Sequence, residues 1–287
     1  MKNVLRTLVY NEQVSLTLAD TTKIVQEGIQ RHHLSITSGK IFGAAISAMT
    51  FMSACLKGET GEVSLSLKTD GTMGEIGISG NRKLNLRGYI LNPQADGVGE
   101  SAEKLCFGKN GALTIIRDDG YSRPFVGSCA LPENCQKDCV DKAFEEYFRI
   151  SEQLPTRITT LVEINAKGEC TFAGVAALQL LPFADESTQK QVSELPLTDV
   201  VADVKNLGVQ ACANKHFNAT ESACELRNAQ YECNCSRSYL LGVLASLGEP
   251  QMRQIIAEDG ELKVHCHYCN TDYVFTDKDA DELFSRK

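Results

Sequence analysis

The chain has no tryptophan and no unbroken apolar run long enough to cross a membrane. A membrane-spanning helix needs about 20 mostly apolar residues, whereas the longest apolar stretches, residues 41–56 and 171–184, are short and interrupted by Ser, Thr or Gln. The first residues also lead into polar sequence without the apolar segment of about 7–15 residues that a secretion signal carries. We therefore expect no membrane association and a cytoplasmic location.

The chain also lacks an excess of basic charge. It carries 29 Lys and Arg against 37 Asp and Glu, a formal net charge of −8 at pH 7. A general nucleic-acid-binding protein needs a basic face to neutralise phosphates, so this class is disfavoured. Apolar residues make up 43% of the chain and charged residues 23%, which is typical of a globular protein and excludes disorder along the whole length.

Cysteine, in contrast, is abundant, with 12 residues in 287. In a reducing cytosol such residues are free thiols, metal ligands or redox centres rather than permanent bridges. Four of them form two close pairs, Cys233 with Cys235 and Cys266 with Cys269, and 30 residues separate the pairs. Four thiolates in this arrangement satisfy a tetrahedral zinc ion. The pattern predicts one bound Zn²⁺.

Two histidines and eight further cysteines offer alternatives. His265 and His267 are competing ligands, but four thiolates already fill the coordination sphere, so we interpret them as flanking residues. Most of the other cysteines are expected to be small core residues, the usual state of an unpaired cysteine. Cys129, Cys135 and Cys139 are a candidate second thiol site. The eight are Cys55, Cys106, Cys129, Cys135, Cys139, Cys170, Cys212 and Cys224.

The predicted zinc site lies in a segment, residues 229–287, that is too short to bury much apolar surface. Domains of this size often depend on a metal, and a structural zinc contributes about 10–16 kcal/mol to folding. Removing zinc is therefore expected to unfold the segment. Oxidation of the ligands would have the same effect, which suits the site to sensing an oxidant. An inert structural zinc ribbon has the same ligands.

Residues 1–178 alternate between helix and strand patterns. Helices are expected over residues 40–57, capped by Thr37 or Ser38, and over residues 135–153, which Pro155 ends. Period-two alternation predicts strands with turns at residues 70–71, 119–120 and 167–168. These strands are expected over residues 63–67, 73–78, 84–90, 112–117, 121–128, 157–164 and 169–178. The order indicates an α+β fold with an antiparallel-sheet core and packed helices.

The chain is expected to have three parts. Residues 1–178 form the α+β core domain, residues 179–228 a helical linker, and residues 229–287 the small zinc-binding domain. The linker loses the strand alternation and shows only weak helical patterns. The last part has 6 basic and 10 acidic residues, which argues against a zinc ribbon that binds nucleic acid.

Separate parts of the sequence carry a family resemblance. The two cysteine motifs, with AEDG at residues 257–260 and NTDYVF at residues 270–275, resemble the thirty-three-kilodalton chaperonin family of redox-regulated heat-shock holdases. Residues 146–157, which include SEQLPTR at 151–157, are similar to the helix-to-strand junction of that family's core domain. Residues 73–88 resemble its central hairpin. The resemblance covers nearly the whole chain.

The resemblance implies a chaperone that holds unfolding proteins without ATP and is not an enzyme. It implies that Cys233, Cys235, Cys266 and Cys269 bind zinc in an inactive, reduced state. Peroxide with heat, or hypochlorous acid, then pairs Cys233 with Cys235 and Cys266 with Cys269. The zinc leaves, the C-terminal domain unfolds, the linker loosens, and the activated protein forms a homodimer. The linker departs from the family, whose linkers tend to be strongly charged, because only 11 of its 50 residues are charged.

No motif identifies the surface that binds unfolded client proteins. The apolar face of the predicted sheet is one candidate, and the same pattern is typical of a core face. The candidate client-binding residues are Val63, Leu65, Leu67, Ile76 and Ile78.

Enzymatic interpretations fit less well. A thiol oxidoreductase would place its C-x-x-C at the start of a helix, where the pKa of a thiol is lowered, whereas Cys266 and Cys269 lie between strand-like segments. A zinc hydrolase needs an open coordination position, which four cysteines do not leave. The glycines at 74, 77 and 80 lack the Lys-Ser and the following helix of a phosphate-binding loop. We therefore predict no catalytic residue.

Overall fold

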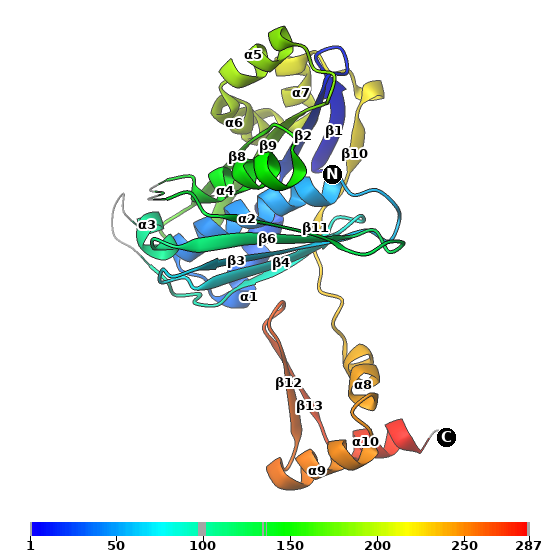
Figure 1. Cartoon of the computed structure of the whole chain (residues 1–287). Coiled ribbons are helices and arrows are strands. Elements are labelled where there is room, and N and C mark those ends of the chain that lie inside the picture. Colours follow the sequence, from blue (N-terminus) through cyan, green and yellow to red (C-terminus); the bar gives the residue numbers. More distant parts are fainter. Residues whose placement is uncertain (1, 97–101, 134, 136, 286–287) are drawn as a thin grey trace. The chain divides into compact units, whose positions relative to one another are not determined.

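The computed structural model describes residues 2–96, 102–133, 135 and 137–285, which form two compact units (Figure 1). The first unit comprises Met1–Glu232 and the second Cys233–Lys287. Both units combine helices with antiparallel strands, which confirms the α+β class. Among the described residues, none of the helices has both the length and the apolar character that crossing a bilayer requires.

The first unit contains two sheets rather than one meander. Sheet A has the strand order β10-β1-β2-β9-β8, and sheet B has the order β11-β5-β4-β3-β6-β7. Sheet A arises because β2 pairs with the distant β9, with Val14 opposite Leu180. Its strands are β1 (Val4–Val9), β2 (Val14–Asp20), β8 (Thr156–Ile164), β9 (Cys170–Leu180) and β10 (Glu225–Arg227). Those of sheet B are β3 (Glu62–Thr69), β4 (Glu75–Asn81), β5 (Asn85–Ile90), β6 (Gly111–Asp118), β7 (Phe125–Ala130) and β11 (Gln230–Tyr231).

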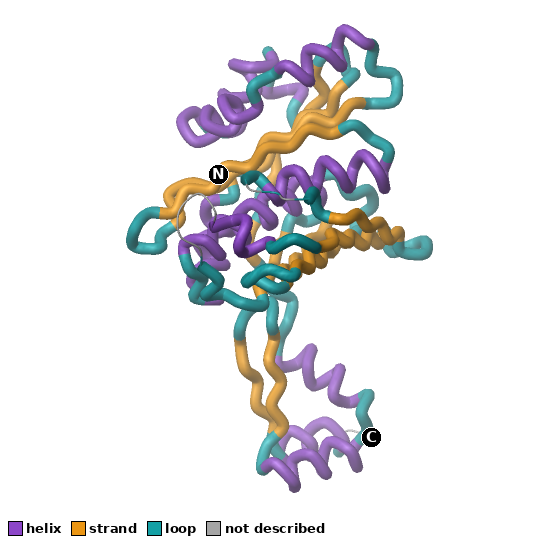
Figure 2. The backbone as a smooth tube through the Cα atoms, turned by 60° about the vertical axis from the view of Figure 1, so that its left-hand side comes forward, coloured by secondary structure: helices purple, strands orange, loops and turns teal. Residues whose placement is uncertain are grey.

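Helix α2 (Ile36–Ala54) lies between the two sheets and contacts strands of both (Figures 1 and 2). From residue 41 to residue 54 every position except half-buried Ala44 is buried, as expected for a helix that is apolar or small on all sides. Its N-cap is Ser35, whose hydroxyl accepts a hydrogen bond from the N–H of Ser38 at 3.1 Å. The predicted cap at Thr37 or Ser38 and the range 40–57 are therefore wrong at both ends.

Helices α1 (Thr22–His32) and α4 (Cys139–Tyr147) also lie between the sheets, and α3 (Ala102–Phe107) is a short helix before β6. The helix predicted over residues 135–153 begins later, at Cys139, and continues as a π-helical turn over Phe148–Glu152. Glu103 fixes this beginning, because its carboxylate accepts hydrogen bonds from the N–H of Cys139 at 2.7 Å and of Asp138 at 3.3 Å.

Three helices lie on the other face of sheet A (Figure 1). These are α5 (Glu186–Glu194), α6 (Leu197–Leu207) and α7 (Val209–Phe217), and a 3-10 turn, η3 (Glu221–Ala223), follows before β10. Their apolar side chains, among them Val200, Val201 and Val204, are buried against Leu16 and Leu18 of β2 in a second core. Residues 179–228 are thus folded as part of the first compact unit. They do not form a separate domain, and a linker role for them would be a functional one.

The second unit is small. It contains α8 (Arg237–Ala245), α9 (Glu249–Asp259), the hairpin β12 (Leu262–Cys266) with β13 (Thr271–Phe275), and α10 (Asp277–Phe284). The hairpin corresponds to the strand-like segments expected on either side of Cys266 and Cys269, whereas α10 was not expected. A capping box between Thr276 and Asp279 starts α10. The hydrophobic cluster of this unit has six buried residues, namely Leu244, Met252, Ile256, Leu262, Phe275 and Ala280.

Candidate metal centre

The four cysteines of the second unit converge from two loops. Cys233 and Cys235 immediately precede α8, which Ser236 caps by accepting a hydrogen bond from the N–H of Tyr239 at 3.1 Å. Cys266 is the last residue of β12 and pairs opposite Thr271 of β13. The loop between these two paired residues therefore carries Cys269 back beside Cys266.

The spacing of the sulfur atoms fits a tetrahedral zinc ion. All four Sγ atoms lie within 4.8 Å of one another, with separations of 3.3 Å for Cys233–Cys235, 3.8 Å for Cys233–Cys266 and 3.1 Å for Cys235–Cys269. Sulfurs placed about 2.3 Å from a tetrahedral zinc are about 3.8 Å apart. In the part of the chain that the structure describes, no second group of three or more Cys, His, Asp or Glu donors converges in this way.

The environments of the thiols differ. Burial opposes ionisation of Cys235, but hydrogen bonds from Tyr273 and from neighbouring thiols outweigh it and lower the pKa of Cys235 to about 7. The Tyr273 hydroxyl lies 3.3 Å from Cys235 Sγ. Burial raises the pKa of Cys269 to about 11 and also raises that of Cys233. The site therefore favours a thiolate at Cys235 near neutral pH, and the thiolate is the form that binds metals and reacts with oxidants.

Arg237, the first residue of α8, ties the first cysteine pair to the hairpin. Its guanidinium donates to the carbonyl oxygen of Val274 and to Asp279 Oδ1, both at 2.6 Å, and lies 4.7 Å from the ring centroid of Phe275. The sequence motifs identify the four cysteines, but they do not reveal Arg237 or Tyr273. Both residues acquire their roles from the folding of the hairpin against α8, and their sequence neighbours carry no signal of it.

The two histidines lie outside the group of converging donors. His265 Nδ1 is 2.6 Å from Asp272 Oδ1, and the His265 and His267 rings meet edge to face with their centroids 5.0 Å apart. Both side chains are exposed. The eight cysteines outside the motifs are all free thiols of the first unit, six of them buried and two, Cys55 and Cys224, half-buried.

The structure places the five candidate client-binding residues in the core. Val63, Leu65 and Leu67 on β3 and Ile76 and Ile78 on β4 are at most 3% exposed and belong to the core cluster that includes α2. Cross-strand pairing puts Leu65 opposite Ile78 and Leu67 opposite Ile76. These side chains would reach a client only if α2 left the sheet, so their client-binding role stays a prediction.

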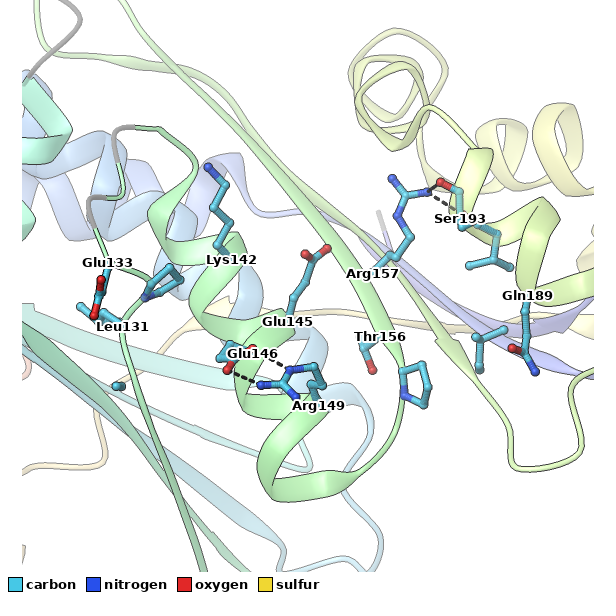
Figure 3. A pocket seen from close by; sticks show the side chains of 15 residues that line it. Leu131, Glu133, Lys142, Glu145, Glu146, Arg149, Thr156, Arg157, Gln189 and Ser193 are labelled. Carbon is cyan, nitrogen blue, oxygen red and sulfur yellow. Dashed lines mark hydrogen bonds and ion pairs between the residues drawn. The ribbon is translucent and has the colours of Figure 1, made fainter. Parts of the chain in front are cut away.

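A cleft of about 780 Å³ separates α4 from α5 in the first unit (Figure 3). Arg157 on β8 reaches across to α5, where its Nη1 donates to the carbonyl oxygens of Val192, Ser193 at 3.1 Å and Leu195 at 2.8 Å. These are carbonyls at the C-terminal end of the helix, which lack helical partners.

The other end of α5 is also held. Its N-cap Asp185 accepts a hydrogen bond from Gln13 Nε2 at 3.0 Å and donates its N–H to Gln13 Oε1 at 2.7 Å. Gln13 lies in the turn between β1 and β2. Arg157 of β8 and Gln13 of the β1–β2 turn therefore hold the two ends of α5, the first helix of residues 179–228.

Comparison with known proteins gives one consistent answer. The family model described as "Hsp33 protein" matches residues 2–276. The chain is 30% identical over 293 residues to the 33 kDa chaperonin of Bacillus cytotoxicus, with 99% of each chain covered, and 29% identical over 296 residues to that of Bacillus mycoides, with 100% of each covered. The crystal structure of the 33 kDa chaperonin from Thermotoga maritima has the same fold, with a TM-score of 0.81 at 22% identity over 99% of this chain and 98% of that one. The chain belongs to the Hsp33 family.

Proposed function

We propose that this protein is a redox-regulated, ATP-independent chaperone that holds unfolding proteins during oxidative stress. The observation that carries the proposal is the convergence of four thiols, with all Sγ atoms within 4.8 Å, in a compact unit of small hydrophobic core. Membership of the Hsp33 family supports the chaperone class. A unit of this size needs its metal ligands to stay folded, and oxidation of the thiolates removes those ligands, so the unit responds to an oxidant by unfolding.

In the reduced protein, Cys233, Cys235, Cys266 and Cys269 hold one Zn²⁺. When bound, the zinc supplies a four-way crosslink between the start of α8 and the β12–β13 hairpin, worth about 10–16 kcal/mol in comparable structural sites. The contacts of Arg237 and the small hydrophobic cluster also stabilise the unit. We propose that these contacts are too few to keep the unit folded once the zinc is lost.

Oxidation removes the ligands. Each pair of thiolates gives two electrons to one peroxide, which forms one disulfide and two hydroxide ions. The proposed pairs are Cys233 with Cys235 and Cys266 with Cys269, as the family resemblance implies. The reduced geometry does not select them, since Cys235 Sγ is 3.1 Å from Cys269 Sγ and 3.3 Å from Cys233 Sγ. Disulfides within such short loops restrain little chain, so the unit is expected to unfold.

Unfolding of this switch is proposed to loosen residues 179–228. The helices of this linker cover apolar side chains of sheet A, including Leu5, Leu16 and Leu18. Their departure would expose an apolar face that can hold unfolded clients. On this account residues 1–178 are the chaperone core and residues 229–287 the redox switch. The oxidised protein acts as a homodimer in the cytoplasm, without nucleic-acid or membrane partners, and catalyses no reaction.

The proposal is tested by light scattering from a heat-unfolding client protein. The reduced, zinc-loaded chain should leave aggregation unchanged, and the chain treated with peroxide at raised temperature should suppress it without ATP. Suppression by both forms would remove the redox switch. Suppression by neither would leave a zinc-stabilised protein without holdase activity.

Variants of the second unit test the ligand assignment. Cys269→Ser should lower the zinc affinity and loosen residues 233–287 without oxidant, because three thiolates remain. His265→Ala, a change in an exposed side chain outside the cluster, is the control and should retain one zinc per chain. Equal zinc affinity in the two variants would show that the ligand set is wrong.

A further inference from the structure

Three arginines from three separate elements surround one carboxylate in the first unit. Arg82, in the turn between β4 and β5, has Nη2 at 3.4 Å from Glu225 Oε1, and Arg227 of β10 has Nε at 3.6 Å from the same oxygen. Arg6 of β1 lies directly opposite Glu225 in the antiparallel pairing of β1 with β10. Side chains at opposite positions have Cβ atoms about 5 Å apart. The cluster of Arg6, Arg82 and Arg227 therefore draws on two strands of sheet A and on one turn of sheet B.

Each of these arginines has a buried nitrogen without a partner. Arg6 Nε, Arg82 Nη1 and Arg227 Nη1 are inaccessible and have no hydrogen-bond partner among the described residues. Buried guanidinium nitrogens are normally hydrogen-bonded, and leaving one unpaired costs free energy. Three unpaired nitrogens on neighbouring side chains indicate a shared acceptor rather than three independent defects.

One uncharged group lies nearby, the buried hydroxyl of Thr17, which is on β2 directly opposite Arg6. The C-terminal end of α2 carries the half-buried Cys55. Burial raises the pKa of its thiol, while the positive charges of Arg6, Arg117 and Arg82 oppose that rise, which shows that these guanidinium groups reach the same region. Arg117 has a buried Nε without a partner among the described residues, but it has its own carboxylate, since its Nη2 lies 2.8 Å from Glu152 Oε1. The cluster of Arg6, Arg82 and Arg227 thus has three positive charges against the single charge of Glu225.

We propose that Arg6, Arg82 and Arg227 form a binding site for a phosphate-type oxyanion. A phosphate group carries about −1.5 to −2 charge near neutral pH, which balances the positive excess of the cluster. Its oxygens accept several hydrogen bonds at once, and arginine is the side chain best suited to donate them. Glu225 holds two of the arginines in place beside the ligand.

An oxyanion at this position would crosslink three elements of the first unit. It would tie β10, the strand that follows the linker helices, to β1 of sheet A and to the β4–β5 turn of sheet B. A ligand that binds only the folded form stabilises it in proportion to the logarithm of its concentration. Phosphate is therefore expected to stabilise the end of the segment 179–228 against release from the core.

Titration of the reduced full-length chain with inorganic phosphate tests the site. Binding is followed by isothermal titration calorimetry and thermal stability by circular dichroism, with sodium chloride at matched ionic strength as the control for screening. The proposal predicts saturable binding and a melting temperature that rises with phosphate but not with chloride. A response equal to that of chloride would overturn it. Parallel titrations with a nucleoside triphosphate and with polyphosphate distinguish a free phosphate from the phosphate of a larger molecule.

Variants then localise the binding. Arg82→Gln removes a guanidinium from a turn and should weaken phosphate binding by about tenfold or more, as expected for loss of a charged hydrogen bond. Arg227→Lys keeps the charge without the planar fork and should weaken binding less. Arg123→Gln, at an exposed arginine outside the cluster, is the matched control and should bind like the unmodified chain. Equal affinity for Arg82→Gln and Arg123→Gln, both measured well below their melting temperatures, would refute the site.

Discussion

Replacing Arg157 with alanine should loosen helix α5 without unfolding the rest of the first unit. Arg157 is the side chain that reaches from β8 of the core to the C-terminal carbonyls of α5, at Val192, Ser193 and Leu195. Among the described residues, Gln13 also holds α5 at its N-cap, and the buried side chains of the helix are Thr188 and Val192. The helix is therefore attached by few interactions, and one of the strongest is removed by a single substitution.

The size of the effect follows from the charge of the donor. A hydrogen bond from a charged group contributes about 1.5–3 kcal/mol, and a cation at a helix C-terminus adds about 0.3–1 kcal/mol. The three bonds of Arg157 share one nitrogen, so they do not add in full. A loss of about 2 kcal/mol corresponds to about a 30-fold rise in the population in which α5 is open.

Native-state hydrogen exchange measures this opening directly. In the reduced, zinc-loaded chain, the amides of α5 should exchange about 30-fold faster in Arg157→Ala, while those of α2 and β9 keep the rates of the unmodified protein. Under the proposed function, the variant should also suppress client aggregation after a shorter exposure to peroxide. Arg157→Lys keeps the charge and should fall between the two.

Arg149→Ala is the matched control. Arg149 lines the same cleft, but among the described residues its guanidinium pairs with Glu146 alone, at 2.6 Å, and its side chain is 70% exposed (Figure 3). Exposed pairs of this kind contribute little to stability. Equal α5 exchange in Arg157→Ala and Arg149→Ala would refute the clamp, and an equal loss of protection throughout the first unit would show that Arg157 supports the whole fold instead.

Two further outcomes are expected. Burial raises the pKa of Asp141 to about 7, although hydrogen bonds from Thr160 oppose the rise. The folded state therefore keeps a proton that the unfolded state loses above about pH 4. As a result, the free energy of unfolding should fall by up to about 4 kcal/mol between pH 4 and pH 7. Urea unfolding at a series of pH values measures how steeply the free energy of unfolding falls with pH. This dependence should be weaker in Asp141→Asn but unchanged in Glu59→Gln, a change at an exposed carboxylate. An equal pH dependence in the two variants would contradict the role of Asp141. Removing zinc with a chelator should expose residues 233–287 to protease while Met1–Glu232 resists, and an uncleaved second unit would show that zinc is not needed for its fold.

The cluster of four cysteines was the most predictable part of the molecule, because it depends on residue type and spacing. In a C-x-x-C pair the two thiols are close in sequence, and here Cys266 ends β12 while Cys269 lies in the turn that follows it. Its supporting residues were not predictable. Tyr273 and Arg237 look like ordinary strand and helix residues until the hairpin packs against α8.

The errors in the fold have a common cause in long-range contacts. Helix α4 begins at Cys139 because Glu103, from another helix, accepts its N–H, and nothing near residue 139 encodes that bond. Ser35, Thr37 and Ser38 are all good helix caps, so local sequence cannot choose among them. The apolar alternation of β3 and β4 is compatible with a client-binding face and with a core face, and the pattern alone cannot say that α2 covers these side chains.

The central claim is that loss of the metal site activates the chaperone, and simultaneous recording of two signals tests it most directly. Zinc release is followed with a chromophoric chelator while the same peroxide-treated sample, at raised temperature, is assayed for suppression of client aggregation. The account predicts that zinc release precedes or coincides with the gain of holdase activity at every peroxide concentration. Full client protection while the zinc is still bound would contradict it.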